Sequence, residues 1–114
     1  MPSELATQGF IVRILPYQVT AEAGETIPFE VEIRNPFFRP KDAIIQIVAP
    51  PGWELEQGVQ TLRISSTHRL SFKVTPPPGL TVRRARLAVD LTIAGQRFGQ
   101  QAESLVTVLA RGTT

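Results

Sequence analysis

The chain has 114 residues, of which 42% are hydrophobic and 19% are charged, and its formal net charge is +2. This balance is typical of one globular domain with its own core, and it excludes a disordered, highly charged tail. The absence of cysteine excludes disulfide bonds and thiolate metal sites, so the core has to stabilise the fold unaided.

No stretch approaches the roughly 18 apolar residues that a membrane-spanning helix needs, so no membrane insertion is expected. The opening MPSELATQG lacks the order of basic, apolar and small residues found in a secretory signal. We expect residues 1–9 to form a flexible leader, residues 10–110 the folded domain and residues 111–114 a tail. The chain is interpreted as a piece of a longer polypeptide, and its compartment is left open by these observations.

Alternation of apolar and polar residues with a period of two predicts β-strands along most of the chain. The first strand is residues 10–15, and Pro16 removes a ladder donor, which requires the strand to bend there or to lie at a sheet edge. A turn is expected over residues 21–25, where Gly24 can adopt a positive φ. The clearest strand is residues 27–34, because every second residue is apolar and most of the others are charged.

A connection is predicted at residues 35–42, NPFFRPKD, because it holds two prolines and begins with Asn35. A third strand follows over residues 43–49, whose odd-numbered residues form an apolar face. Ile44 and Val48 make the opposite face partly apolar too, as in a strand covered on both sides. The sequence APPG ends this strand.

Two shorter strands are predicted at residues 59–65 and 70–74, followed by a rigid stop at TPPPG, residues 75–79. The proline run cannot donate to a sheet ladder, so the chain has to leave the sheet there.

The longest alternation predicts a pair of strands at the end of the chain. Residues 84–93 alternate strictly, and AGQ at 94–96 predicts a tight hairpin before a last strand that runs to about Leu109. In the last strand the apolar residues change parity, which indicates a bulge or a change of exposed face and leaves its register open.

About seven short strands, with turn signals about every 8 to 12 residues, predict an all-β fold: an immunoglobulin-like antiparallel β-sandwich. The prolines fall mainly in the connections, and no segment has the pattern of a helix. A closed barrel is the alternative. No internal repeat is visible, which excludes a solenoid or a propeller.

Three motifs mark the corners of this sandwich: GE at 24–25 before a strand that ends in Asn35, APPGW at 49–53, and TP at 75–76 before the long hairpin. Together they resemble the NEW3-type (alpha-galactosidase-associated) family of bacterial immunoglobulin-like domains, over residues 10–109. Such domains are often attached to glycoside hydrolases and other exported enzymes. The resemblance therefore implies an accessory sandwich without a catalytic residue, in an extracellular or cell-envelope location. The loop after the asparagine departs from the family pattern, because PFFRP replaces a glycine-containing turn.

Trp53 is the only tryptophan, and it lies directly after Pro-Pro-Gly. A flat ring on a turn can stack against a sugar, which makes Trp53 a candidate carbohydrate contact. The interpretation we favour is that the ring folds back over the open end of the sandwich and closes the core.

Phe37 and Phe38 are adjacent, so both cannot point inward on an extended segment. An exposed aromatic ring beside Arg39 makes these two residues candidates for contact with a partner. Single exposed apolar residues are also common on protein surfaces, and this remains the alternative.

Catalysis is not expected from this chain. Glu30 and Glu32 share one face of a strand beside Arg34, and such a solvated face differs from the two carboxylates that face each other across a glycosidase cleft. A single histidine, His68, supplies neither a metal shell nor a catalytic triad. No nucleotide, metal or hydrolase motif occurs, so we predict no catalytic residue, no metal site and no cofactor.

Charge is distributed unevenly along the chain. Four basic and eight acidic residues precede Gly58, whereas eight basic and two acidic residues lie between Gly58 and the end of the sequence. The arginines of the long hairpin could form a basic strip that binds an anion or docks on an acidic neighbouring domain. They are Arg83, Arg84, Arg86 and Arg97. Aromatic residues are not interleaved with them, so nucleic-acid binding is not expected.

These patterns favour a noncatalytic accessory module that spaces or docks the neighbouring domains of a larger bacterial enzyme, such as a hydrolase, or of a surface protein. The expected partner is a neighbouring domain of the same polypeptide. The alternative is a module that binds carbohydrate or an anion, through the Trp53 corner or the arginine strip. A small enzyme has no residues to support it.

Overall fold

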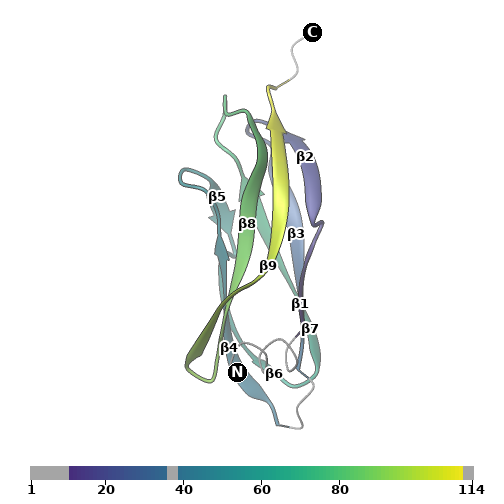
Figure 1. Cartoon of the computed structure of the whole chain (residues 1–114), viewed down its shortest axis with the longest axis vertical. Helices are drawn as coiled ribbons and strands as arrows, with labels where there is room; N and C mark the ends of the chain where they lie inside the picture. The colour runs from purple at the N-terminus through teal and green to yellow at the C-terminus, as the bar shows by residue number, and fades with distance from the viewer. Residues whose placement is uncertain (1–10, 36–38, 112–114) are drawn as a thin grey trace.

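The computed structural model describes residues 11–35 and 39–111, and within these ranges it contains nine β-strands in two sheets and no helix (Figure 1). This confirms the predicted all-β, immunoglobulin-like sandwich. The strands are β1 (Ile11–Leu15), β2 (Gln18–Glu22), β3 (Ile27–Arg34), β4 (Lys41–Val48), β5 (Glu54–Glu56), β6 (Val59–Ile64), β7 (Thr67–Thr75), β8 (Val82–Ile93) and β9 (Gln96–Leu109). Among the described residues no helix is long and apolar enough to cross a membrane.

The two sheets form the two layers of the sandwich. One has four strands in the order β1-β3-β7-β5, and the other has five in the order β2-β9-β8-β4-β6. The Cα atoms extend over 55 × 24 × 19 Å, so the body is elongated along the strands. β1 begins near one end of this body and β9 ends near the other (Figure 1). The first residue of β1, Ile11, pairs with Arg34, and the last residue of β9, Leu109, pairs with Glu22.

The N-terminal strand changes sheets at Pro16. Before it, β1 is an edge strand of the four-stranded sheet, and after it β2 is an edge strand of the five-stranded sheet. The predicted bend at Pro16 is therefore confirmed. Two hydrogen bonds to β9 fasten the crossing: Leu105 N donates to the Tyr17 carbonyl (2.9 Å), and Ser104 Oγ donates to the Pro16 carbonyl (2.7 Å).

Apolar side chains of alternate parity from both sheets meet in one continuous core. Phe29 of β3 lies directly opposite Phe72 of β7, and their rings stack with centroids 5.1 Å apart. No buried side-chain nitrogen or oxygen in the described ranges lacks a hydrogen-bond partner, which is expected of a well-packed interior. The largest fully buried apolar side chains are Phe72, Ile33, Ile45, Ile64, Leu87, Leu91, Val31 and Val74.

The APPGW corner carries the chain from one layer to the other. It follows β4 of the five-stranded sheet and precedes β5 of the four-stranded sheet. Gly52 has a φ of 88°, and Trp53 N donates to the Pro50 carbonyl at 3.3 Å, so the corner is a tight turn. The Trp53 side chain belongs to the core cluster and lies over the core at this crossing.

Asn35 fastens the end of β3 to the hairpin between β6 and β7. Its backbone N donates to the Ser66 carbonyl at 2.8 Å, and its Nδ2 donates to the carbonyls of Ile64 (2.9 Å) and Arg39 (3.2 Å). The residue is only 5% exposed. A buried amide with these partners explains why an asparagine, rather than an apolar residue, ends this strand.

The β8–β9 hairpin is confirmed at the predicted position. Ala94 and Gly95 have φ values of 49° and 82°, the pair of positive angles found in a type I′ turn. The register between the two strands shifts at three places, so the predicted irregularity of the last strand is also confirmed. Figure 1 shows that these two long strands twist together along the front of the sandwich.

Four details differ from the sequence predictions. Ile44 and Val48 are exposed, so β4 is covered on one face and not on both. β2 and β5 were not predicted, so the strand number exceeds seven. β2 and β9 pair in parallel, which makes the sandwich not wholly antiparallel. β7 begins at Thr67 and β8 at Val82, earlier than predicted. The expected leader and residues 112–114 lie outside the described residues.

Candidate functional site

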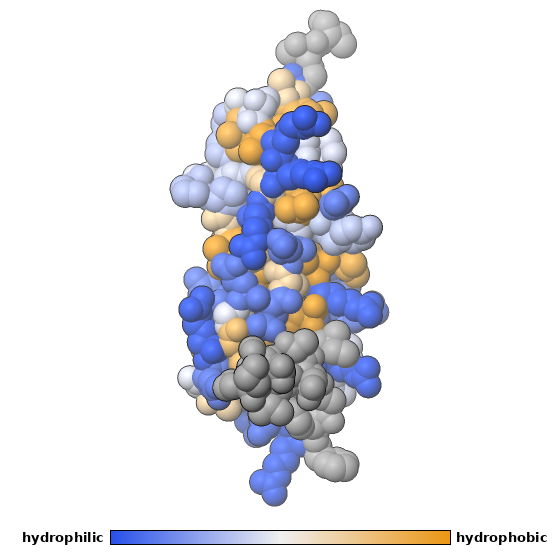
Figure 2. All heavy atoms as spheres, in the orientation of Figure 1, coloured by the Kyte–Doolittle hydropathy of each residue, from blue (hydrophilic) through white to orange (hydrophobic). Residues whose placement is uncertain are grey.

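The predicted arginine strip lies on the outer face of the five-stranded sheet, along β8 and β9, where acidic partners interrupt it. Arg86 Nε lies 2.9 Å from Glu103 Oε2 on the neighbouring strand. Arg97 forms a second ion pair, with Asp90. On the face that carries β8 and β9, Figure 2 shows hydrophilic and hydrophobic residues interleaved. Two of the four arginines of the strip are therefore neutralised, and the strip is not a continuous cationic surface.

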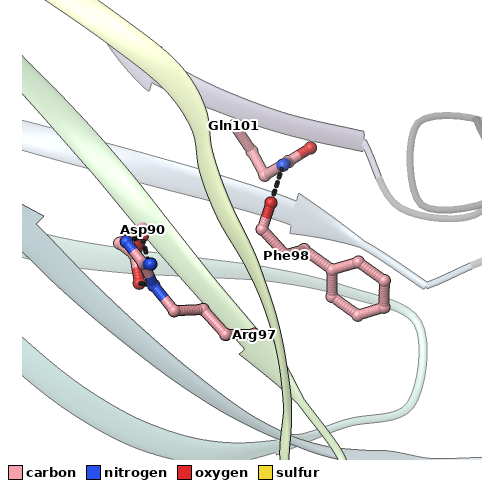
Figure 3. A network of polar contacts seen from close by, with 4 residues as sticks. All are labelled: Asp90, Arg97, Phe98 and Gln101. Atoms are coloured by element: carbon pink, nitrogen blue, oxygen red, sulfur yellow. Dashed lines mark hydrogen bonds and ion pairs between the residues drawn. The ribbon is translucent and has the colours of Figure 1, made fainter. Parts of the chain in front are cut away.

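The pair of Asp90 and Arg97 has a two-pronged geometry. Arg97 Nη2 donates to Asp90 Oδ1 at 2.7 Å, and Arg97 Nε donates to Oδ2 at 3.1 Å (Figure 3). The Asp90 side chain is 8% exposed, whereas that of Arg97 is 69% exposed. The hydrogen bond to Asp90 and its negative charge raise the pKa of Arg97 above its ordinary value. The guanidinium thus covers a carboxylate that would otherwise be buried without a counter-charge.

Bulges in β9 position this ion pair. The register places Thr92 opposite Arg97 but Leu91 opposite Gly99, so Phe98 is an extra residue on β9. A second extra residue, Gln101, donates from Nε2 to the Phe98 carbonyl at 2.8 Å (Figure 3). The bulges bend the strand, and the side chain of Arg97 reaches back along the sheet to β8.

Arg84 lies at a third irregularity, between Val82 and Ala85 of β8. Its φ is 54°, and its backbone N donates to Thr107 Oγ1 at 3.2 Å. Neither Arg83 nor Arg84 forms an ion pair with any residue that the structure describes. These two are therefore the cations of the strip that remain available to an external anion.

Trp53 is 9% exposed and contributes to the core. A ring that stacks against a pyranose needs one free face, and this arrangement leaves none of useful size. The other candidate aromatics, Phe37 and Phe38, lie outside the described residues, so their expected contact with a partner stays a prediction.

Glu30 and Glu32 lie on the outer face of the four-stranded sheet, as predicted, and both approach Arg69. The Arg69 Nε atom is 3.2 Å from Glu32 Oε2 and 3.9 Å from Glu30 Oε1. His68 Nε2 accepts a hydrogen bond from Ser65 N at 3.2 Å, which stabilises the β6–β7 turn. Within the described ranges no three His, Cys, Asp or Glu residues are grouped as a metal site requires.

One feature has no counterpart among the sequence predictions: a line of hollows on the outer face of the four-stranded sheet, beside β5. The largest has a volume of about 400 Å³, and an adjacent one has about 350 Å³. The outward positions there include the short residues Pro28, Ser71 and Thr75 among charged ones. That size pattern was the only available signal, and it acquires meaning only when the strand pairing is known.

No family model matches the chain, and no curated protein matches it either. Solved structures do match in fold. The CARDB domain of a Pyrococcus furiosus protein, solved in complex with di-metal ions, has a TM-score of 0.53 and 15% identity over 90% of this chain and 94% of that chain. A non-cellulosomal cohesin from Archaeoglobus fulgidus has a TM-score of 0.51 and 13% identity, covering 89% of this chain and 91% of that one.

A third match lies inside a larger protein. A family 123 glycoside hydrolase from Clostridium perfringens has a TM-score of 0.56 and 6% identity, and the match covers 91% of this chain but 28% of that chain. Identities this low establish a shared fold and nothing finer. The chain has the immunoglobulin-like fold of CARDB and cohesin domains, and its resemblance to the NEW3 family remains a prediction.

Proposed function

We propose that this chain is a noncatalytic module that holds the neighbouring domains of a larger polypeptide at a fixed spacing. The observation that carries the proposal is the path of the chain. The described part starts at Ile11 near one end of the sandwich, and β9 ends at Leu109 near the opposite end. The rise from Ile11 to Glu22, which pairs with Leu109, is about 36 Å at roughly 3.3 Å per residue.

The body between these two ends is built to resist bending. One continuous core joins the two sheets, and hydrogen bonds from Ser104 and Asn35 fix the places where the chain leaves a sheet. Proline-bounded corners add stiffness, because each proline ring fixes its φ. Domains attached at the two ends would therefore be separated by a nearly constant distance, unlike domains joined by a flexible linker.

The finer proposal is an accessory module of NEW3 type in a larger bacterial enzyme or surface protein, located outside the cell or in its envelope. Two observations support it. The three corner motifs of the resemblance each lie at a sheet crossing or a strand end. A sandwich of the same fold also forms about a quarter of a glycoside hydrolase chain, so this fold does occur within such enzymes.

The alternative, a module that binds carbohydrate or an anion, has less support. The Trp53 ring is in the core, and two of the four arginines of the strip, Arg86 and Arg97, form ion pairs with acidic residues. Within the strip, only Arg83 and Arg84 are left without a described ion-pair partner, so an anion would have to bind there.

The test is the size of the natural polypeptide that contains this sequence. An antibody raised against the folded chain should detect, in an immunoblot of the source organism, a band much larger than 12.6 kDa. Peptide mass spectrometry of that band should identify a hydrolase or surface-protein domain. A single band at 12.6 kDa would refute the proposal that the module spaces domains of one polypeptide.

A further inference from the structure

We infer that the outer face of the four-stranded sheet, beside β5, binds an extended segment of a partner that contains lysine or arginine. This inference rests on the proposed function, because it identifies the surface with which the module contacts a neighbour. The face is defined by three rows of side chains across β3, β7 and β5, and we call it the β5 groove.

The rows follow from the register. Pro28, Lys73 and Glu56 lie side by side across the three strands, and Thr75 lies beside Glu54. Leu15 of β1 lies next to Glu30, which is opposite the Ser71 of β7. Long side chains thus alternate with short ones, and hollows form over the short ones.

The largest hollow exists because β5 is short. β5 ends at Glu56, and Gln57, with a φ of 64°, turns the chain away from the sheet. The surface beside Ser71 is therefore left uncovered. The residues that line this hollow of about 400 Å³ are Leu15, Pro28, Phe29, Glu30, Glu56, Gln57, Ser71, Phe72 and Lys73.

The hollows form one continuous path. The second, of about 350 Å³, shares Glu56 and Lys73 with the first, and a third, of about 370 Å³, shares Glu54 and Thr75 with the second. From Ser71 to the proline run after β7 the path is about 20 Å long, the length of roughly six extended residues. A chain segment fits this shape better than a compact small molecule does.

Charge determines which segment would bind. Glu54 and Glu56 are exposed on β5, and neither forms an ion pair with a described residue. Glu30 lies on the opposite side of the largest hollow, 3.9 Å from Arg69. Two cations line the described path, Lys73 in the first two hollows and Arg111 in the third, so the three carboxylates of Glu30, Glu54 and Glu56 outnumber them. A basic segment is complementary to this surface, and an acidic segment is repelled.

The apolar surface in the β5 groove also favours lysine and arginine. Leu15 is 46% exposed, and Pro28 of β3 lies directly opposite Lys73 of β7. Lysine and arginine have long aliphatic stems that cover apolar surface while the charged group stays in water. A stem could therefore lie along Leu15 and Pro28 while its charged group reaches Glu30 or Glu56.

The occupant would bind on the face and not add to the free edge of β7. The Ser71 carbonyl, which lies beyond the end of β5, already accepts a hydrogen bond from Gln60 Nε2 at 3.0 Å. Gln60 Nε2 also donates to the Gln57 carbonyl at 3.0 Å. A strand added at this edge would have to displace that amide, so the side-chain hollows are the better site.

The test uses the intact chain and two acetylated, amidated pentapeptides, in which valine alternates either with arginine or with glutamate. Titration to about 1 mM peptide, followed by amide chemical shifts, measures binding and locates it. The arginine peptide should shift the signals of β5 and of residues 71–75, and the glutamate peptide should not. Absence of shifts with the arginine peptide, or shifts confined to β8 and β9, would overturn the inference.

Three variants distinguish the contribution of charge to peptide binding from that of the shape of the groove. The double variant Glu54→Gln, Glu56→Gln should weaken binding about threefold to tenfold, as expected for two exposed ion pairs. Ser71→Leu keeps every charge and fills the largest hollow, so it should abolish binding. Asp42→Asn, on the outer face of the five-stranded sheet, is the control and should bind as the parent chain does. Equal affinity for all three variants would refute the groove.

The two proposals fail separately. Loss of peptide binding with an unchanged, larger natural polypeptide would refute only the groove. A natural polypeptide of 12.6 kDa that still bound the arginine peptide would refute the spacing function and leave the groove as a binding site.

Discussion

Ser104 and Pro16 are 88 residues apart in the sequence, and a hydrogen bond of 2.7 Å joins the Ser104 hydroxyl to the Pro16 carbonyl. The contact connects the middle of β9 to the point where the N-terminal strand changes sheets. Ser104 is fully buried and Pro16 is half-buried, so water has restricted access to the carbonyl when the hydroxyl is removed. The hydrogen bond thus holds both layers together at their shared edge.

Ser104→Ala is expected to lower the free energy of unfolding by about 1–3 kcal/mol, because it leaves a carbonyl without its donor. Urea denaturation followed by circular dichroism measures the change. Ser71→Ala, at an exposed position of β7, is the control. Its free energy of unfolding should stay within about 0.5 kcal/mol of that of the parent chain. Equal stability of the two variants would show that the contact contributes nothing.

Arg97→Ala should destabilise the chain more than Arg63→Ala does. The first leaves the buried Asp90 carboxylate without its counter-charge, whereas the second breaks a pair with Asp42 in which both side chains are exposed. Thermal unfolding temperatures, measured side by side, test this order. The reverse order would contradict the structural role of the pair.

The pH dependence of the stability lost in Arg97→Ala follows from the direction in which the pKa of Arg97 is shifted. The pKa of Arg97 is raised in the folded chain, so its stabilisation is fully present below the ordinary arginine pKa and is lost only above it. The stability difference between the parent chain and Arg97→Ala is therefore expected to be constant between about pH 7 and pH 10. A difference that shrinks across this range would require another titrating group.

Trp53→Ala is expected to cost about 3–5 kcal/mol, the range for removing a large core aromatic residue. Trp53→Phe should cost less, because the smaller ring keeps part of the packing. Chemical denaturation followed by circular dichroism gives both values. A cost of Trp53→Ala below about 1 kcal/mol would mean that the ring does not close the core and would revive the carbohydrate platform.

Ala94→Asn should stabilise the chain by about 0.5–1 kcal/mol. Ala94 has a φ of 49°, which is unfavourable for alanine, and Asn-Gly is the preferred pair in a type I′ turn. Thermal denaturation measures the gain. Thr81→Asn, at an exposed position of another loop, controls for an effect of asparagine itself, and an equal gain there would contradict the turn argument.

Most of the sandwich could be predicted because its strands alternate cleanly. β3 and β4 bury every second residue, so sequence parity and burial agree. β2 and β5 have no such signal. Ala21 is the only buried residue of β2, and all three residues of β5 are exposed, so these strands are defined by their partners β9 and β7. Pairing between distant segments cannot be inferred from local periodicity.

The same limit applies to the candidate sites. The arginines were found from their spacing, but the pairing of Arg97 with Asp90 depends on the bulges of β9, which no local pattern predicts. The motif around Trp53 predicted the corner because proline and glycine restrict the chain locally. The β5 groove could not be predicted, because it combines residues of four strands.

The central claim is that the sandwich is a stiff spacer, and a distance measurement tests it most directly. Because the chain has no cysteine, Thr67→Cys and Thr81→Cys can carry two spin labels near opposite ends of the strands. Pulsed electron paramagnetic resonance should give one narrow distance peak on the order of 30 Å. The peak should not move when the chain is embedded in its larger natural polypeptide. A broad or two-peaked distribution would contradict a fixed spacing.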